Sequence, residues 1–218
     1  MFQVSDRLKN VKVSASAAMT RKVRDLRAEG VKIVGLSSGE PDFPTPLHAI
    51  EAAHKAALAG DTKYPPQDGV KPLKEAVRAK FKRDNKLDYT LDEVMVSNGS
   101  KQIMYDALMA SVNTGDEVII PALTFVATGN AVLQAGFKPV FVDVKRETLN
   151  IDVEKIEAVV TSRTRAIMPV SLYGQPCDMD EINAVAAAHF LPVIEDAAQA
   201  IGAKFKSWPA GSMSRSAK

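Results

Sequence analysis

From Glu93 onward the sequence alternates short apolar runs with segments of helical spacing, and this alternation constrains the fold more than any other feature. The apolar runs are expected to be strands: Val94–Val96, Glu117–Ile120, Val140–Val144, Ala166–Val170 and Pro192–Glu195. The segments expected to be helices are Lys101–Ser111, Phe125–Leu133, Val153–Val160 and Met179–Ala188. Short apolar strands separated by helices form a mostly parallel sheet that is covered on both faces. We therefore predict an α/β fold, a three-layer sandwich around a mostly parallel sheet.

Before this alternation the sequence predicts helices joined by rigid loops. Helices are expected over Ser14–Arg27, from Pro46 to about Leu58 with Thr45 as the cap, and over Lys71–Asn85. The run GEPDFPTP at residues 39–46 contains three prolines, which exclude helix and sheet interior there. At the other end, Trp208–Lys218 is small and polar and is expected to be a loop.

Charge and cysteine content exclude several classes of protein. The chain has 28 Lys and Arg against 26 Asp and Glu, a net charge of +2, which gives no electrostatic reason to expect a nucleic acid or a membrane as partner. Cys177 is the single cysteine, so an internal disulfide and a metal site of several thiolates are excluded. The charged start and the lack of a long apolar run predict no secretory signal and no membrane span. We expect a cytoplasmic protein of ordinary globular composition.

The first motif that can carry chemistry is the strand–loop–helix run Val96–Gln102, VSNGSKQ. Backbone N–H groups at the N-terminus of a helix bind anions, and small residues let a phosphate approach them. Gly99, Ser100 and Lys101 are therefore candidate phosphate ligands. The alternative is a plain turn with Ser100 as the helix cap. The run matches neither of the glycine-rich nucleotide-binding patterns, so a nucleotide is not favoured.

The second motif is the acidic pair Glu195-Asp196 at the carboxyl end of an apolar strand, where open α/β sheets bind their ligands. A carboxylate there needs a cation or hydrogen bonds. Asp196 facing a protonated ring nitrogen would meet that need, and Gln199 could reach a substituent of the ring. The alternative is that Asp196 caps a helix.

A third candidate is Phe125, which follows a strand end and could stack on a flat ring; the alternative is a core position. Gln175, in a turn after a strand, is a weaker candidate for a polar contact at the site. Four further residues that often carry chemistry are interpreted as non-catalytic because none has a partner at a useful spacing: His48, His54, His189 and Cys177.

These motifs resemble two known families. Residues 1–112 resemble class I aspartate aminotransferases, through GEPDF at 39–43, TKYP at 62–65 and SNGSKQ at 97–102. Residues 114–206 resemble the DegT/StrS-type aminotransferases of keto-sugars, through GDEVI at 115–119, TFVAT at 124–128, PVFVDV at 139–144, LYGQP at 172–176 and IEDAAQ at 194–199. Both families are fold-type I enzymes that depend on pyridoxal 5'-phosphate, so the chain resembles a hybrid of two branches of one fold.

The resemblance implies a set of roles. Gly99, Ser100 and Lys101 match the stretch that binds the cofactor phosphate, Phe125 the aromatic residue that stacks on the ring, and Asp196 the partner of the ring nitrogen. It also places Gln199 near the ring hydroxyl, Tyr64 at the phosphate of a neighbouring subunit, and Gly39 near the substrate carboxylate. A homodimer is implied, with a small-molecule amino donor and a keto acceptor as substrates. The domains expected are an N-terminal arm with the substrate-side loop (1–45), a partial large domain (46–206) and an irregular end (207–218).

The sequence departs from both families at the lysine that joins the cofactor and moves the proton. Neither family's lysine motif is present, and Lys204 and Lys206 are too close to Asp196. Lys218, after a serine-containing run, is the candidate catalytic lysine; the alternative is a chain that stops before that lysine. Three functions follow: an aminotransferase acting on a keto acid or keto-sugar, an inactive remnant of one, or an unrelated α/β binding module.

Overall fold

A computed structural model describes residues 11, 14–36, 39, 41 and 43–214. The chain divides into two compact units, Met1–Lys63 and Tyr64–Lys218. The first contains α2 (Ala15–Ala28) and α3 (Leu47–Leu58), close to the predicted bounds. None of its described residues is buried. The predicted cap at Thr45 is wrong, because α3 begins one residue later and Pro46 occupies the cap position without a side-chain hydrogen bond.

The second unit contains the predicted parallel sheet. Its strands are β1 (Glu117–Pro121), β2 (Lys138–Val142) and β3 (Thr164–Ile167), in the order β2-β1-β3 with both pairings parallel. The expected strand Pro192–Glu195 is present only as isolated parallel bridges, from Ile167 to Val193 and from Val170 to Asp196. These bridges place the 193–196 segment beside β3.

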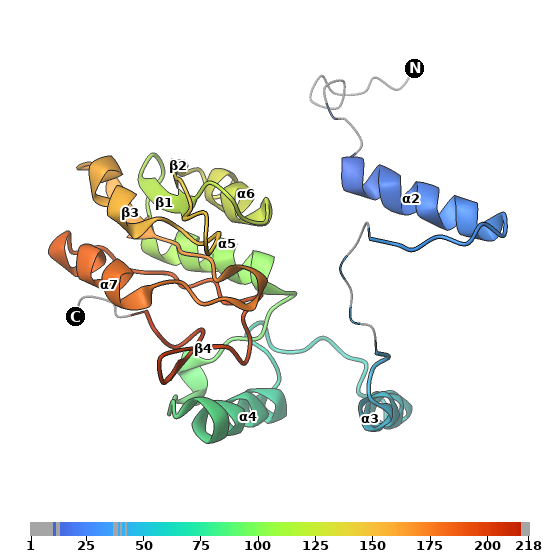
Figure 1. The fold of residues 1–218 in the computed structure, drawn as a ribbon. Helices are drawn as coiled ribbons and strands as arrows, with labels where there is room; N and C mark the ends of the chain where they lie inside the picture. Colours follow the sequence, from blue (N-terminus) through green and yellow to red (C-terminus); the bar gives the residue numbers. More distant parts are fainter. Residues whose placement is uncertain (1–10, 12–13, 37–38, 40, 42, 215–218) are drawn as a thin grey trace, which may run out of the picture. The chain divides into compact units, whose positions relative to one another are not determined.

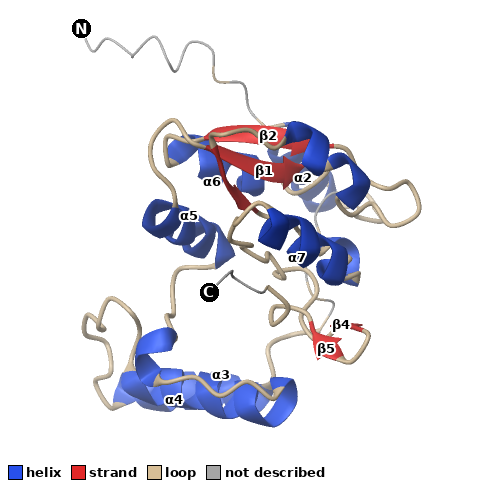
Figure 2. Cartoon of the chain, turned by 90° about the vertical axis from the view of Figure 1, so that its left-hand side faces the viewer, coloured by secondary structure: helices blue, strands red, loops and turns tan. Residues whose placement is uncertain are grey.

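Helices cover both faces of this sheet, as the alternation predicted (Figures 1 and 2). Val118 and Ile120 of β1 pack with α5 (Ser100–Ser111) and α6 (Ala127–Gln134). Ile119, between them, packs with α7 (Met179–Ala188) on the other face. Because successive side chains of a strand point to opposite faces, one apolar strand serves two cores. The α/β three-layer prediction is therefore confirmed.

Two predicted elements differ from the structure. The predicted strand Val94–Val96 follows a 3-10 turn, η2 (Leu91–Glu93), and is extended but pairs with no strand in the described part of the chain. The predicted helix Val153–Val160 is two 3-10 turns, η3 (Val153–Lys155) and η4 (Glu157–Val159). Its apolar residues 153, 156 and 159 repeat every three residues, which is the period of a 3-10 helix.

The ends of the second unit also refine the prediction. The predicted helix over residues 71–85 is α4 (Lys71–Lys80) followed by a π-helical turn, η1 (Phe81–Asn85). Near the C-terminus, where the sequence predicted a loop from Trp208, β4 (Lys204–Phe205) pairs with β5 (Trp208–Pro209). Met213 beyond it is buried in the core. Among the described helices, none combines the length and the apolar character that crossing a bilayer requires.

Candidate functional site

A cavity of about 650 Å³ lies within the unit formed by residues 64–218. Its walls are mostly apolar side chains of α4, η1 and α5, together with the segment 194–211. Two of the sequence motifs meet there, because Ser100 at the start of α5 and Asp196 at the end of the sheet both line it. Neither Lys101 nor Phe125 is among its lining residues in the described structure.

The start of α5 is an uncapped helix N-terminus. Gly99 is the cap residue, with φ 117° and ψ 167°, and no side chain caps the helix. The first bonds to the Gly99 carbonyl come from the N–H groups of Gln102 and Ile103. Within the described part of the chain the N–H groups of Ser100 and Lys101 have no backbone acceptor. Ser100 is thus the first helical residue, not the cap, and this N-terminus has donors available for an anion.

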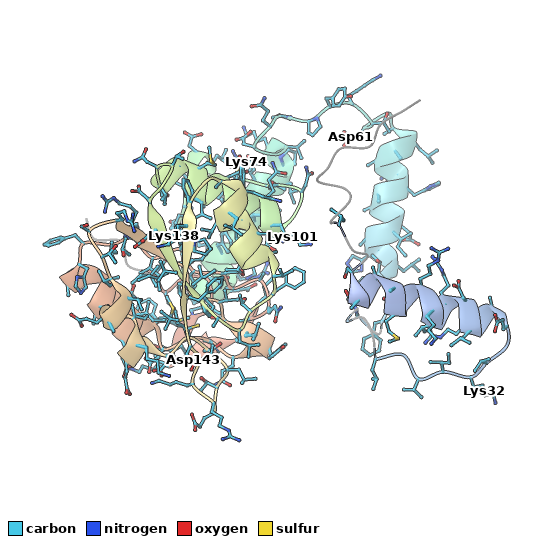
Figure 3. All side chains as sticks on the ribbon, turned by 90° about the horizontal axis from the view of Figure 1, so that it is seen from above. Lys32, Asp61, Lys74, Lys101, Lys138 and Asp143 are labelled. Atoms are coloured by element: carbon cyan, nitrogen blue, oxygen red, sulfur yellow. The ribbon has the colours of Figure 1, made fainter. Side chains whose placement is uncertain are left out.

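Lys101 and Phe125 lie next to each other. The Lys101 ammonium nitrogen is 5.0 Å from the centre of the Phe125 ring, and Figure 3 shows Lys101 at the edge of the unit that contains the sheet. Phe125 is 52% exposed, so the alternative that it belongs to the core is wrong. It precedes α6, which begins at Ala127 rather than at the predicted Phe125. An exposed ring with a cation over it offers a stacking surface beside positive charge.

The two acidic residues at the sheet end have different tasks. Asp196 is fixed by its backbone, which donates to the Pro169 carbonyl and accepts from the Ser171 N–H. One carboxylate oxygen of Asp196 accepts the Ala198 N–H at 3.1 Å. The residues after it form a turn and no helix, so the helix-cap alternative is wrong. Its other oxygen has no hydrogen-bond partner among the described residues, which leaves it available to a cation.

The Glu195 carboxylate, by contrast, is fully engaged. Its two oxygens accept the N–H groups of Gly211 at 2.6 Å and Met213 at 2.9 Å. Glu195 therefore anchors the turn after β5, whose residues Ala210 and Gly211 line the cavity. No local pattern indicates this role, because the two donors are sixteen and eighteen residues away.

Two amide side chains, those of Gln199 and Asn150, form hydrogen bonds with the turn after β3. The Gln199 side-chain oxygen accepts the Tyr173 N–H at 3.1 Å, where Tyr173 has φ 54°. Asn150, which is buried, accepts the Leu172 N–H at 3.2 Å. Its amide group also donates to the carbonyls of Gln175 and Pro176 at 3.0 and 3.1 Å. Gln175 thus contributes its backbone here. Sequence reasoning missed Asn150, because an asparagine in a loop is ordinarily a surface residue.

Neither Tyr64 nor Gly39 is among the residues that line the cavity. Tyr64 is fully exposed, and Gly39 is an exposed loop residue of the other unit. Lys218 lies outside the described residues. Among the described residues, the lysine that lines the cavity is Lys80, which sequence reasoning missed; its ammonium donates to the Asn85 side-chain oxygen at 2.7 Å.

The residues interpreted as non-catalytic have ordinary surroundings. Cys177 is buried, its thiol lies 3.1 Å from the Val170 carbonyl, and burial raises its pKa to about 12, so the thiol is unreactive. His189 ends α7 and contacts Glu157 at 3.2 Å. The described residues contain no cluster of side chains suited to a metal ion.

Known proteins are similar to this chain over most of its length. The model of the DegT/DnrJ/EryC1/StrS aminotransferase family matches residues 88–218, more than half of the chain. The chain belongs to this family. Members of this aminotransferase family use pyridoxal 5'-phosphate, so the cofactor that the motifs predicted follows from membership.

The curated relatives of this chain are named aspartate/prephenate aminotransferases. The chain is 40% identical over 190 residues to the aspartate/prephenate aminotransferase of Nitrosomonas europaea, covering 85% of this chain and 48% of that protein. The chain is 47% identical over 166 residues to the aspartate/prephenate aminotransferase of Cereibacter sphaeroides, covering 76% of this chain and 42% of that protein. The chain spans about half the length of these relatives. A match over 190 residues extends well past residue 112, so the two resemblances overlap along the chain.

Solved structures confirm the fold. The aspartate aminotransferase of Rhizobium meliloti superposes with a TM-score of 0.75 at 35% identity, over 90% of this chain and 51% of that one. The aspartate aminotransferase of Thermus thermophilus with maleate superposes with a TM-score of 0.76 at 34% identity, over 89% of this chain and 53% of that one. The DegT-family chain thus has the fold of pyridoxal-phosphate aminotransferases of fold type I, over about half of their length.

Proposed function

We propose that this chain takes part in a pyridoxal-phosphate-dependent transfer of an amino group from an amino acid to a keto acid or keto-sugar. The observation that carries the proposal is the single cavity that receives both the N-terminus of α5 at Ser100 and the carboxylate of Asp196. Family membership and the names of the relatives support the same reaction class. Those names point to aspartate as donor and prephenate as acceptor.

The residues present suit a cofactor that has an anion at one end and a ring cation at the other. The Ser100 and Lys101 N–H groups have no backbone acceptor in the described chain, and Gly99 has open space where a side chain would be. At the sheet end, one carboxylate oxygen of Asp196 has no hydrogen-bond partner among the described residues. An anion at the helix end and a cation at the carboxylate are each the favoured partner of those groups.

Each of these residues would have a definite task. When bound, pyridoxal phosphate supplies an electron sink for the substrate carbanion. Ser100 and Lys101 would hold its phosphate through their N–H groups, and the Lys101 ammonium would add positive charge there. Asp196 would keep a proton on the ring nitrogen, Phe125 would cover one face of the ring, and Gln199 would be the residue near the ring hydroxyl. Lys218 is the proposed proton-transferring lysine, and Gly39 is the residue proposed beside the substrate carboxylate.

A matched pair of substitutions tests the helix N-terminus. Ser100→Pro removes one N–H at the first helical position, where proline is tolerated, whereas Ser100→Ala keeps that N–H. We expect Ser100→Pro to weaken the binding of pyridoxal phosphate at least ~10-fold and Ser100→Ala to change it little. Binding is followed by the cofactor's visible absorbance. Equal affinities of the two variants would contradict the phosphate assignment.

The ring end is tested with Asp196→Asn, which keeps the shape and removes the charge. We expect ~10-fold or greater loss of cofactor binding, since the ring nitrogen loses its anionic partner. Asp92→Asn, an exposed aspartate of η2 outside the cavity, is the control and should bind as the parent does. If both variants bind like the parent, the unrelated binding module becomes the better interpretation.

A second candidate is a chain that binds the cofactor without transferring an amino group. One observation favours this candidate. Among the described residues the lysine that lines the cavity is Lys80, and its ammonium is already hydrogen-bonded to Asn85. Borohydride reduction followed by peptide mass spectrometry separates the two. A cofactor adduct on Lys218, with amino transfer from aspartate, supports the first proposal; binding without an adduct supports the second.

We also propose a homodimer in which Tyr64 serves the neighbouring subunit. Tyr64 is fully exposed, and the first unit carries exposed apolar side chains at Phe43, Leu47, Ile50 and Leu58. Burial of such side chains against a second copy is favourable. Sedimentation velocity should therefore show a dimer that Ile50→Asp weakens. A folded monomer at all concentrations would rule this arrangement out.

A further inference from the structure

A buried lysine of α4 forms an ion pair with an aspartate of the preceding loop. The Lys74 side chain is 7% exposed, and its ammonium donates to the carboxylate of Asp68. Lys74 is labelled in Figure 3. The hydrogen bond from Lys74 lowers the pKa of the Asp68 carboxyl below its ordinary value, which favours the ionised carboxylate. Because a buried ammonium is costly to leave without a counter-charge, the fold favours the paired state.

The backbone of the same loop lies directly against Val96. The Asp68 carbonyl accepts the Val96 N–H at 3.0 Å. Gly69, the next residue, has φ 101°, and a Cβ added there would lie only 2.8 Å from Val96 Cβ. Val96 belongs to the extended run that forms no bridge with any strand of the described structure. The loop that carries the ion pair therefore supplies the backbone partner of Val96.

Val96 leads directly into the candidate phosphate site. Three residues later Gly99 precedes α5, whose first N–H groups have no backbone acceptor in the described chain. Within this turn the Asn98 amide group donates to the Gln102 side-chain oxygen at 3.2 Å, a contact between the turn and its own helix. A shift of Val96 would therefore move the turn and the N–H groups that follow it.

We propose that Asp68 and Lys74 are positioning residues for the cofactor phosphate, because their ion pair holds the loop against Val96 and thereby keeps the N–H groups at the start of α5 in place. This inference rests on the proposed function and deepens it. Neither residue is among those that line the cavity, so both act through the backbone of Val96.

Stability alone is a weak reason for such a pair. A buried ion pair generally adds little stability over apolar side chains of similar volume. Donors that are already fixed in place, in contrast, bind an anion without the cost of ordering them at that moment. The pair lies where that advantage counts, one backbone hydrogen bond away from the run that leads to the phosphate turn.

Lys74→Met tests the pair, since methionine has a similar shape and no charge. The control is Lys82→Met, because Lys82 forms an exposed pair with Asp88 at 2.7 Å and is not among the residues that line the cavity. The affinity of each variant is measured for pyridoxal 5'-phosphate and for pyridoxal, which has no phosphate. We expect Lys74→Met to bind pyridoxal 5'-phosphate at least ~10-fold more weakly than the parent and to bind pyridoxal as the parent does. Lys74→Arg keeps a charged donor and should restore the affinity.

A second measurement is made without cofactor, by amide hydrogen exchange followed with NMR. The Val96 amide should exchange at least ~10-fold faster in Lys74→Met than in the parent, because its acceptor at Asp68 is no longer held. The Met168 amide, which donates to the Ile119 carbonyl at 2.8 Å, is the internal reference and should be unchanged. Unchanged exchange at Val96 would overturn the proposal.

A pair of glycine variants tests the same contact without changing a charge, and it decides the matter if Lys74→Met does not fold. Gly69→Ala places a Cβ against Val96, whereas Gly60→Ala, also at a positive φ, places one where no atom lies within 4 Å. We expect Gly69→Ala alone to lose affinity for pyridoxal 5'-phosphate while it keeps that for pyridoxal. Equal affinities of the two glycine variants for pyridoxal 5'-phosphate would contradict the proposal.

These outcomes separate the inference from the proposed function. A parent chain that does not bind pyridoxal 5'-phosphate would refute the proposed function and this inference with it. A parent that binds the cofactor, together with a Lys74→Met variant that loses affinity for both compounds alike or for neither, overturns this inference alone. A merely structural role of the pair predicts the equal loss.

Discussion

At the scale of single residues, Glu117 shows best how a buried charge is accommodated. Its side chain is 2% exposed at the start of β1, where it accepts the Thr161 hydroxyl at 2.6 Å, Arg163 at 2.9 Å and Lys138 at 3.0 Å. Lys138 is labelled in Figure 3. The Thr161 hydrogen bond, followed by that of Lys138, lowers the Glu117 pKa from 4.5 to about 2. The ionised form is therefore the form that the fold favours.

This predicts a dependence of stability on pH. A carboxylate whose pKa is lower in the folded state stabilises it above the unfolded pKa, and the effect is lost as the pH falls. The free energy of unfolding should thus decrease as the pH falls from 4.5 to about 2. The Glu117→Gln variant should be less stable than the parent at pH 7, and acidification should lower its free energy of unfolding by a smaller amount. Urea unfolding at a series of pH values measures both. Parallel pH profiles for the parent and the variant would contradict the assignment.

Residues of the candidate site were predictable where local sequence fixes their place. Ser100 and Asp196 each follow a strand-like run directly, so their position at a helix start or a sheet end could be read from the chain. Asn150, Lys80 and the anchoring role of Glu195 could not, because each depends on groups brought near by the fold. Lys218 stays a prediction.

At the scale of elements, helix ends depend on a few backbone conformations. Gly99 has φ 117° and ψ 167°, a region that is essentially restricted to glycine. A Cβ there would meet no atom within 4 Å, so the effect of Gly99→Ala is backbone strain alone.

We expect Gly99→Ala to lower the free energy of unfolding by ~1–3 kcal/mol. Gly129→Ala is the matched control: Gly129 lies within α6, and its added Cβ would be at an ordinary 3.8 Å from Ile120 Cδ1. This control should raise stability by ~0.5–1 kcal/mol, because alanine favours helix. Urea unfolding of both variants decides, and an unchanged midpoint for Gly99→Ala would mean that the turn relaxes without strain.

The end of α7 carries a side chain that its backbone disfavours. Phe190 has φ 54° and is 85% exposed, and the N–H groups of Phe190 and Leu191 bond back to Ala187 and Ala186. This is a Schellman helix end, whose left-handed residue is usually glycine. Phe190→Gly should therefore raise stability by ~0.5–1 kcal/mol, measured as a higher thermal midpoint, while Phe190→Ala should not. A lower midpoint for the glycine variant would show that the exposed ring has a partner.

Element type followed from sequence where apolar periodicity is unambiguous, as in α5 and β1. The strand prediction failed for Val94–Val96, because a strand needs a neighbouring strand to pair with and the described chain provides none there. The helix prediction failed for Val153–Val160, where an apolar period of three was taken as helical spacing although it belongs to 3-10 turns.

At the scale of the whole molecule, stability resides in one unit. Every buried apolar residue of the described structure lies at Val94 or beyond, and none lies in residues 1–63. The packing that resists unfolding is thus confined to the unit beginning at Tyr64.

Limited trypsin digestion should therefore cut first at exposed lysines and arginines before Tyr64. The expected product is a resistant fragment that begins at Tyr64, after cleavage at Lys63, and it should keep the cooperative unfolding of the parent. Mass spectrometry of a time course identifies it. Early cleavage at Arg165, inside β3, would show that the sheet is less stable than its packing indicates.

The sequence by itself determined the α/β class, most helix bounds and the two ends of the candidate site, because apolar periodicity and helix-start residues act over a few positions. Only the tertiary structure decided that those ends share one cavity, and that Glu195 anchors a turn while one Asp196 oxygen has no hydrogen-bond partner among the described residues. The reason is physical: such contacts join residues far apart in the chain, and their positions are set by how strands and helices pack rather than by any local preference.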